Sequence, residues 1–156
     1  MPTNNDAASR HQTSKSMAPY NVVPVADQWT KPYWDGASEH RLMIQRCQSC
    51  GYYNHPPVFI CMGCNDRDAS LTFEQVSGQG TVYSWFVVYH SQVGGFEEKA
   101  PYLVAAVEMK EQPRLFLISN ILDCHYGEVE MGMPVEVVWE RADGEITIPQ
   151  FRPLVG

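Results

Sequence analysis

The C-terminal half of the chain consists of short apolar runs separated by polar and glycine-containing segments. Gly80–Tyr89 is dense in β-branched and aromatic residues, a composition that favours strands, and Tyr102–Met109 is a second run. Three further runs of this kind follow, at Arg114–Asn120, Val135–Arg141 and Glu145–Phe151. Asp143-Gly144 separates the last two and is a strong hairpin turn. The pattern predicts a mainly β protein with strands throughout this region.

The order of these runs indicates the topology. The predicted strands follow one another closely, except for a longer connection at 123–133, where we expect a short helix or a loop. Five strands with one such insertion between the third and the fourth are typical of a small Greek-key barrel of the OB type. The sequence therefore predicts a five-stranded OB-fold domain.

The first of these strands has two apolar faces. One face is formed by Val82, Ser84, Phe86 and Val88, and the other by Tyr83, Trp85, Val87 and Tyr89. A barrel interior needs only one of them. The other face therefore requires cover from the N-terminal helix, from the metal-binding module or from another protein.

A different hydrophobic pattern lies nearer the N-terminus and predicts a helix over residues 28–40. Asp27 is a candidate N-cap, and Pro32 falls in the first turn, where its missing N–H costs little. Gly36 either ends a first short helix or weakens a longer one. The spacing i, i+4, i+5 gives this helix an aromatic face, formed by Trp29, Tyr33 and Trp34.

These patterns divide the chain into segments. We expect a polar, disordered tail at 1–19, an N-terminal helical segment at 20–45, a metal-binding module at 46–70 and the barrel domain at 71–156. The tail lacks the apolar core of a secretion signal, and no apolar run is long enough to span a bilayer. The sequence therefore predicts a cytoplasmic protein that does not bind membranes.

Four of the five cysteines form two Cys-x-x-Cys pairs, Cys47 with Cys50 and Cys61 with Cys64. Each pair can place two thiolates on one ion, and the two pairs complete a tetrahedron of sulfur ligands. Such a site leaves no open position for water or substrate, which suits a structural zinc ion. Iron is the alternative occupant, and a red colour would identify it. Thiolates kept for a metal also suit a reducing compartment.

Other reactive side chains have simpler interpretations. Cys124 adjoins His125, but neighbours on a strand point to opposite faces, so we expect a bystander thiol and not a nucleophile with its base. His55 lies inside the metal-binding module, whose sulfurs already satisfy an ion. His90 ends the first barrel strand and is interpreted as a solvated loop residue. The sequence therefore predicts no catalytic residue.

Several motifs occur in an order that resembles a known family. They are Tyr33-Trp34, Gln45-Arg46-Cys47-x-x-Cys50-Gly51, Pro56-Pro57, Cys61-x-x-Cys64, Val76-Ser77-Gly78-x-Gly80-Thr81-Val82-Tyr83-Ser84, Pro101-Tyr102-x-Val104-Ala105, Gly132-Met133-Pro134-Val135-x-Val137 and Phe151-x-Pro153. Together they resemble the DUF35 family, in which a rubredoxin-like zinc ribbon is joined to an OB-fold. The resemblance covers residues 27–153 and implies a set of zinc ligands, Cys47, Cys50, Cys61 and Cys64.

The resemblance also implies a role in acyl-CoA metabolism. Members of the family typically form complexes with thiolase-like enzymes or hydratases, which carry the catalytic residues, while the DUF35 subunit organises the complex and helps to shape the CoA or acyl channel. Candidates for CoA contacts near the ribbon are Lys31, Arg41 and Arg46. Val58 and Gln79 occupy positions where the family often has a basic residue, which argues against direct phosphate binding.

Three functional hypotheses follow. The first is an accessory subunit of an acyl-CoA-processing hetero-oligomer with a thiolase-like (acyltransferase, thiolase or aldolase) or hydratase partner; aromatic residues are enriched at interfaces, and the candidates for partner binding are Trp29, Tyr33, Trp34, Tyr83 and Trp85. The alternative is single-stranded nucleic-acid binding by the OB-fold, against which the net charge of −7 argues. An independent enzyme is the third, and turnover by the purified chain would establish it.

Overall fold

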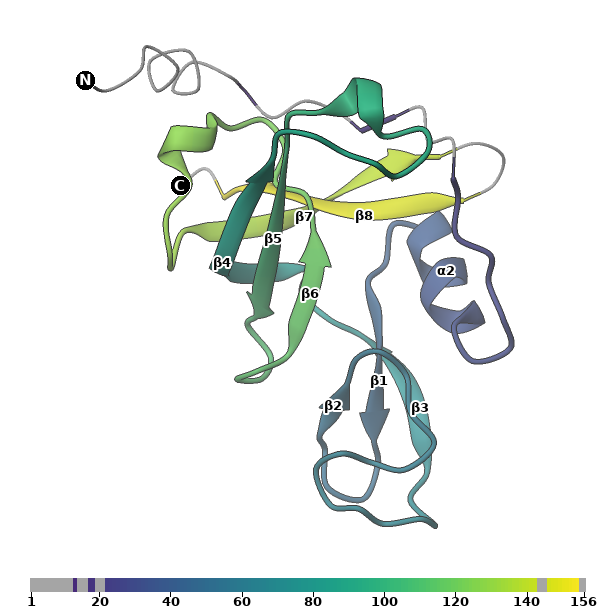
Figure 1. Ribbon diagram of the computed structural model, residues 1–156. Helices are drawn as coiled ribbons and strands as arrows, with labels where there is room; N and C mark the ends of the chain where they lie inside the picture. Colours follow the sequence, from purple (N-terminus) through teal and green to yellow (C-terminus); the bar gives the residue numbers. More distant parts are fainter. Residues whose placement is uncertain (1–12, 14–16, 19–21, 143–145, 155–156) are drawn as a thin grey trace, which may run out of the picture.

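The computed structural model describes residues 13, 17–18, 22–142 and 146–154. It contains two antiparallel sheets and, within the described residues, one α-helix (Figure 1). The helix and strands are α2 Lys31–Ser38, β1 Met43–Cys47, β2 Tyr53–Asn54, β3 Leu71–Gln75, β4 Gln79–Val88, β5 Tyr102–Met109, β6 Phe116–Ser119, β7 Pro134–Arg141 and β8 Thr147–Pro153. The expected mainly β fold with an N-terminal helix, a ribbon and a five-stranded domain is confirmed.

Helix α2 is shorter than the sequence predicts. It begins at Lys31 because the carboxylate of Asp27 accepts hydrogen bonds from the backbone N–H groups of Trp29 and Thr30, at 2.9 and 2.7 Å, and so forms a separate turn ahead of the helix. Gly36 lies inside the helix, packed so closely on Met43 that a Cβ would overlap its side chain. None of the described helices has the length and apolarity needed to cross a membrane.

The five-stranded sheet has the order β6-β5-β4-β7-β8 and curls until its two ends meet. At the seam, Ile121 forms a parallel bridge with Phe151, and the N–H of Leu122 donates to the carbonyl of Phe151 at 2.7 Å. The first strand of the domain, β4, pairs with both β5 and β7. This is the strand order of a small Greek-key barrel, so the predicted OB-type topology is confirmed.

Strand β4 contains an irregularity that changes which side chains face the core. Val82 pairs with Val107, but Ser84 pairs with the next residue along β5, so Tyr83 is an extra residue in the ladder. Val82 is buried before this bulge, whereas after it Trp85 packs against the core and Phe86 is exposed. The predicted division of residues 82–89 into two faces is therefore wrong, because one extra residue reverses the alternation.

The connections differ in how well the sequence anticipates them. The segment 123–133 contains a short 3₁₀ helix at Tyr126–Glu128, one of the two expected outcomes. Strand β8 begins at Thr147 and extends to Pro153, later than predicted at both ends. The predicted turn at Asp143-Gly144 lies outside the described residues.

Met17 packs against the barrel although it lies in the segment 1–19 that the sequence predicts to be disordered. Its side chain is buried in a small apolar cluster with Ala142. Its N–H donates to the Glu140 carboxylate at 3.2 Å, and its carbonyl accepts a hydrogen bond from the ammonium group of Lys99. Backbone and side chain of Met17 therefore both bind the folded domain.

The ribbon and the barrel share one hydrophobic core. Strand β3 begins just after the predicted boundary at 70/71 and pairs with β1, so it is the third strand of the ribbon sheet. Leu42, Ile44 and Val76 at the base of the ribbon belong to the same buried cluster as the barrel interior. The metal-binding module thus stands on the barrel and not on a free linker.

Candidate metal centre and the surfaces around it

The two Cys-x-x-Cys turns have matching backbone geometry. The N–H of Gly51 donates to the carbonyl of Cys47 at 2.8 Å, and the N–H of Asn65 donates to the carbonyl of Cys61 at 2.9 Å. Gly51 and Asn65 both have a positive φ, 77° and 56°, a conformation that glycine and asparagine adopt most readily. The sequence therefore builds the same turn twice, once after β1 and once in the long loop before β3.

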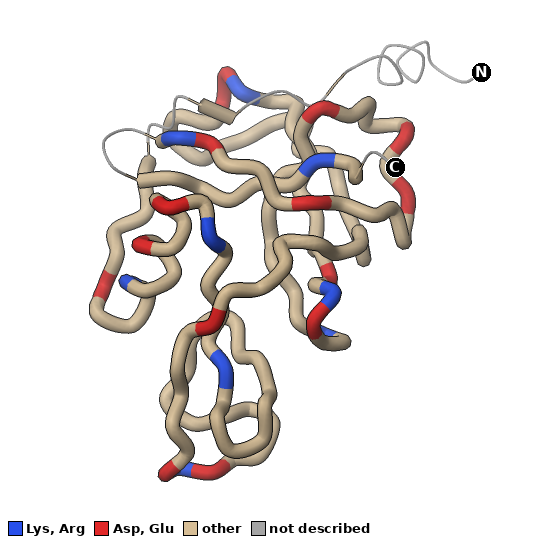
Figure 2. The backbone as a smooth tube through the Cα atoms, turned by 180° about the vertical axis from the view of Figure 1, so that it is seen from behind, with Lys and Arg blue, Asp and Glu red and all other residues tan. Residues whose placement is uncertain are grey.

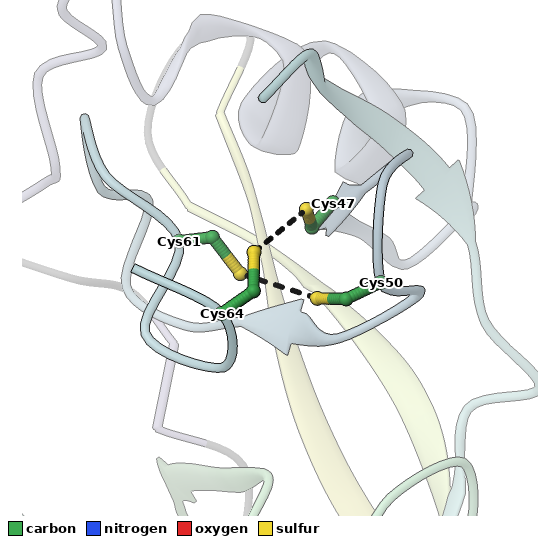
Figure 3. Close-up of side chains that lie close together, drawn as sticks. All are labelled: Cys47, Cys50, Cys61 and Cys64. Atoms are coloured by element: carbon green, nitrogen blue, oxygen red, sulfur yellow. Dashed lines mark hydrogen bonds between the residues drawn. The ribbon is translucent and has the colours of Figure 1, made fainter. Parts of the chain in front are cut away.

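The four sulfur atoms converge on one point between these turns (Figure 3). All four lie within 4.8 Å of one another, with 3.8 Å between the Sγ atoms of Cys47 and Cys64 and 3.6 Å between those of Cys50 and Cys61. A tetrahedron with Zn–S bonds of about 2.3 Å has edges of about 3.8 Å. The donor set and its spacing therefore fit a structural zinc ion, which would have no open coordination position.

The surroundings of one of the four sulfurs favour its ionised form. Desolvation opposes ionisation of Cys61, but hydrogen bonds from the backbone N–H groups of Cys64 and Gly63 and from the other cysteine side chains outweigh it and lower the pKa of this thiol to about 6. The N–H of Gly63 lies 3.3 Å from the Cys61 sulfur. Asn54 positions the same turn, because its Oδ1 accepts a hydrogen bond from the N–H of Met62 at 3.0 Å. Such contacts orient metal ligands and stabilise the thiolate.

The basic residues proposed for CoA contacts are each paired with a carboxylate. Lys31 binds Asp35 at 2.7 Å within α2, and Arg41 binds Glu39. More generally, Lys and Arg alternate with Asp and Glu over the molecule and do not gather in one basic stripe among the described residues (Figure 2). A role of Lys31 and Arg41 in CoA binding stays a prediction.

The third candidate, Arg46, has the most partners. Its Nη1 lies 2.8 Å from a carboxylate oxygen of Glu74, its Nε donates to the carbonyl of Gly51 at 3.0 Å, and its guanidinium lies 5.1 Å from the ring centre of Tyr53. Hydrogen bonds from Gln48 and then from Arg46 lower the pKa of Glu74. These contacts hold β1, β3 and the first cysteine turn together, which is a structural role.

The aromatic candidates for partner binding do not form one surface. Tyr33 packs against the shared core, and its ring lies 4.9 Å from that of Trp34 and 5.6 Å from that of His55. Burial raises the pKa of Tyr33 above its usual range and lowers the pKa of His55. Trp29 is exposed and contacts Phe59 edge-on at 4.3 Å. The exposed ribbon loop at Phe59 is a surface that sequence reasoning missed.

The two candidates from the barrel are separated by the bulge. Tyr83 points outward and its ring lies 4.8 Å from that of Phe116, whereas Trp85 packs against the core. Exposed Phe86 and Ile118 were not identified from the sequence, because both belong to strands whose two faces are apolar. Binding of a partner by any of these residues stays a prediction.

The lone thiol has an environment that opposes nucleophilic chemistry. Cys124 is buried, and its Sγ lies 3.8 Å from the carbonyl of Ile121. Burial raises its pKa to about 11, so the protonated thiol is the stable form near neutral pH. The neighbouring His125 has its Nδ1 3.2 Å from the hydroxyl of Thr13. This arrangement agrees with the interpretation of Cys124 as a bystander.

A four-cysteine zinc ribbon joined to an OB-type barrel defines the class of protein. Comparison with family models agrees, since residues 34–69 match "ChsH2, rubredoxin-like zinc ribbon domain" and residues 73–140 match "ChsH2, C-terminal OB-fold domain". The chain is also 37% identical over 130 residues to a DUF35 domain-containing scaffold protein of Methanocaldococcus jannaschii, covering 78% of this chain and 88% of that one. This chain belongs to the DUF35 family.

Two further relatives carry names from acyl-CoA and aldolase chemistry. A probable enoyl-CoA hydratase alpha subunit of Thermomonospora curvata is 39% identical over 123 residues, covering 79% of this chain but only 37% of the relative. A solved chain described as "Ltp2-ChsH2(DUF35) aldolase" is 36% identical, with a TM-score of 0.73, and is covered over its full length by 85% of this chain. This chain thus spans little more than a third of the hydratase subunit.

Proposed function

We propose that this protein is an accessory subunit of an acyl-CoA-processing complex, bound to a thiolase-like or hydratase enzyme. The observation that carries the proposal is the likeness of this fold, over the full length of the other chain, to the DUF35 chain of an aldolase named for two components. The similarity to a hydratase alpha subunit supports the same class of partner. In this role the zinc ribbon and the barrel form a rigid body that the enzyme binds.

The chemistry of the described site agrees with an accessory role. Four thiolates around one ion leave no position at which a substrate could be activated. Cys124 is held in its protonated form by burial. The reaction therefore belongs to the partner, and this subunit contributes structure and a part of the wall around the acyl-CoA.

A more specific question is which part of the acyl-CoA this subunit contacts. Lys31 begins α2, Arg41 lies between α2 and β1, and Arg46 lies on β1 of the ribbon. A channel between the two proteins at this place would bring the CoA phosphates near these three side chains. Each of them is already neutralised by a carboxylate. We therefore place the acyl chain, and not the phosphates, against this subunit.

Single-stranded nucleic-acid binding receives no support from the arrangement of charges. A groove that follows a nucleic-acid backbone needs clustered positive charge beside stacking aromatics. Here the exposed aromatic Tyr83 lies on a strand without Lys or Arg, and the net charge is −7. An oligonucleotide-binding titration at two salt concentrations serves as the negative control for the experiments below.

Co-expression tests the proposal directly. The full chain is produced with each thiolase-like or hydratase protein encoded near it, and the mixtures are analysed by size-exclusion chromatography with light scattering. We expect one stable hetero-oligomer, no turnover by this chain alone, and turnover of an acyl-CoA by the partner that depends on this chain. Separate elution together with partner activity that is unaffected by this chain would overturn the proposal.

A further inference from the structure

One side of the barrel carries a mainly apolar surface that the shared core does not use. It is the outer side of strands β4, β5 and β6, which lie side by side in Figure 1. We call this surface the barrel face and define it by six residues, Tyr83, Phe86, Val104, Ala106, Phe116 and Ile118. Strand pairing makes them neighbours, because Phe86 lies opposite Val104 and Ala106 lies opposite Ile118.

The bulge in β4 creates this surface. In a regular strand Phe86 would point to the same side as the buried Val82. The extra residue Tyr83 reverses the alternation, so that Trp85 turns inward and Phe86 turns outward beside Val104. Bulges commonly re-aim a side chain at functional positions. Here the bulge adds two aromatic rings, those of Tyr83 and Phe86, to the outside of the barrel.

Several side chains of the barrel face are exposed to solvent. The side chain of Ile118 is 71% exposed, Phe86 is 60% exposed and Tyr83 is 53% exposed. Folded monomers rarely leave a contiguous apolar patch of more than a few hundred Å² in water, and larger patches usually mark interaction sites. Exposed aromatic residues at the centre of such a patch are the kind that contribute most to binding.

A polar border surrounds one end of the barrel face. Glu108 pairs with Phe116 across β5 and β6 and also lines a groove of about 370 Å³. Gln79 and Lys110 line the same groove, and the Lys110 ammonium lies 3.3 Å from the side-chain carbonyl of Gln79. An apolar centre with a polar border is the usual composition of a protein–protein interface.

Charge decides between the possible occupants. A second copy of this chain would bring two proteins of net charge −7 together, and like charges oppose association. A partner whose contact surface carries positive charge complements the net charge of −7 instead. We propose that the barrel face is the docking surface for the thiolase-like or hydratase enzyme, through an apolar patch of that enzyme flanked by Lys or Arg; this inference rests on the proposed function above.

The test uses the full chain and the partner identified by co-expression. The barrel-face variant carries Phe86→Thr and Ile118→Thr, which remove apolar surface and place in the strands a β-branched residue that favours them. The matched control carries Phe59→Ser and Met62→Ser at the ribbon, where the two side chains are 70% and 62% exposed. Zinc content and the urea midpoint of each variant establish that it is folded. The affinity for the partner is measured at low and high salt.

We expect the barrel-face variant to bind at least about tenfold more weakly than the wild type. We expect the ribbon control to bind within about twofold of the wild type, and the wild-type affinity to fall as salt rises. Should the threonine pair unfold the barrel, Ile118→Lys alone replaces it, because this exposed position tolerates a charge in the free protein and not in an apolar interface.

Each contrary outcome has a distinct meaning. Wild-type complex formation with unchanged affinity of the barrel-face variant overturns the docking surface and leaves the proposed function intact. If only the ribbon control binds the partner more weakly, the interface lies on the ribbon, and the docking surface on the barrel face is likewise overturned. A wild-type dimer that the barrel-face variant converts to a monomer assigns the surface to a second copy. Failure of the wild type to bind any thiolase-like or hydratase protein overturns the proposed function and the docking surface together.

Discussion

The side-chain amide of Gln112 forms hydrogen bonds with the backbone of Tyr53 at the edge of the ribbon sheet, as a neighbouring strand would. Its Oε1 accepts a hydrogen bond from the N–H of Tyr53 at 2.8 Å, and its Nε2 donates to the carbonyl of the same residue at 3.0 Å. Gln112 lies in the β5–β6 hairpin of the barrel, whereas Tyr53 begins β2 of the ribbon. One amide group therefore joins the two domains through both backbone groups of one residue.

This contact should set how firmly the ribbon is held. Removing it in Gln112→Ala leaves the backbone groups of Tyr53 without their partners, and the free energy of unfolding should fall by about 1–3 kcal/mol. The Tyr53 amide should exchange its hydrogen at least about tenfold faster. Urea unfolding and amide exchange measure the two effects. Gln112→Glu keeps the acceptor but loses the donor, so it should also be destabilising.

Gln48→Ala is the matched control for this experiment. Gln48 is an exposed glutamine whose side chain binds Thr72 and Glu74 within the ribbon and does not reach the barrel. Gln48→Ala should change the hydrogen-exchange rate of the Tyr53 amide by less than about twofold. Equal effects of the Gln48 and Gln112 substitutions on Tyr53 would mean that Gln112 does not join the domains in solution.

Removal of the metal should unfold the ribbon and leave the barrel folded. A tetrathiolate zinc site contributes on the order of 10 kcal/mol to the folding of such a module. In Cys61→Ser, or after chelation of the wild type, amides of residues 48–70 should lose protection while those of β4 and β5 keep it. Hydrogen exchange with mass spectrometry and a zinc assay measure this. Cys124→Ala, a cysteine outside the site, should retain one zinc per chain; a Cys61→Ser variant that retains it too would contradict the assignment.

The sequence predicts the parts of this protein that repeat a local pattern. The cysteine ligands follow from their spacing, and the predicted strand Tyr102–Met109 has the observed bounds of β5. The bulge at Tyr83 escapes prediction because residues on both sides of β4 are apolar, so either alternation satisfies the pattern. The contact of Gln112 with Tyr53 escapes it for another reason: a single polar side chain that binds a distant backbone leaves no periodic signal.

Close packing between β4 and β5 gives a sharp steric prediction. A Cβ added to Gly80 would lie 2.5 Å from the carbonyl oxygen of Glu108 and 2.8 Å from Cγ1 of Val107, and the first of these is backbone that cannot move aside easily. Gly80→Ala should therefore cost about 1–3 kcal/mol in urea unfolding. Gly94→Ala, which would meet nothing within 4 Å, should be neutral or slightly stabilising. Equal stability of the two variants would show that the β4–β5 pairing is looser than described.

Arg46 distinguishes a structural role from a role in CoA binding. Arg46→Met keeps the apolar stem but loses the Glu74 ion pair and the contact with the Tyr53 ring, so we expect a small loss of stability in urea unfolding. The KM of the complex for acyl-CoA should stay unchanged. Lys31→Met, which breaks an exposed pair within α2, should change neither quantity. A raised KM with unchanged stability for Arg46→Met would assign this residue to the CoA site instead.

The burial of His55 predicts a pH dependence of stability. Burial lowers the pKa of His55 in the folded protein, so the unfolded chain takes up a proton first as the pH falls. Stability should therefore be fully present above the ordinary histidine pKa of about 6.5 and decline as the pH falls below it. His55→Phe keeps an aromatic ring against Tyr33 and should remove this decline, whereas His90→Phe in an exposed loop should retain it. Urea midpoints between about pH 8 and 6 measure the effect, with the zinc content checked at each pH because metal affinity also depends on pH. Identical slopes for the wild type and His55→Phe would show that His55 is accessible to protons in the folded state.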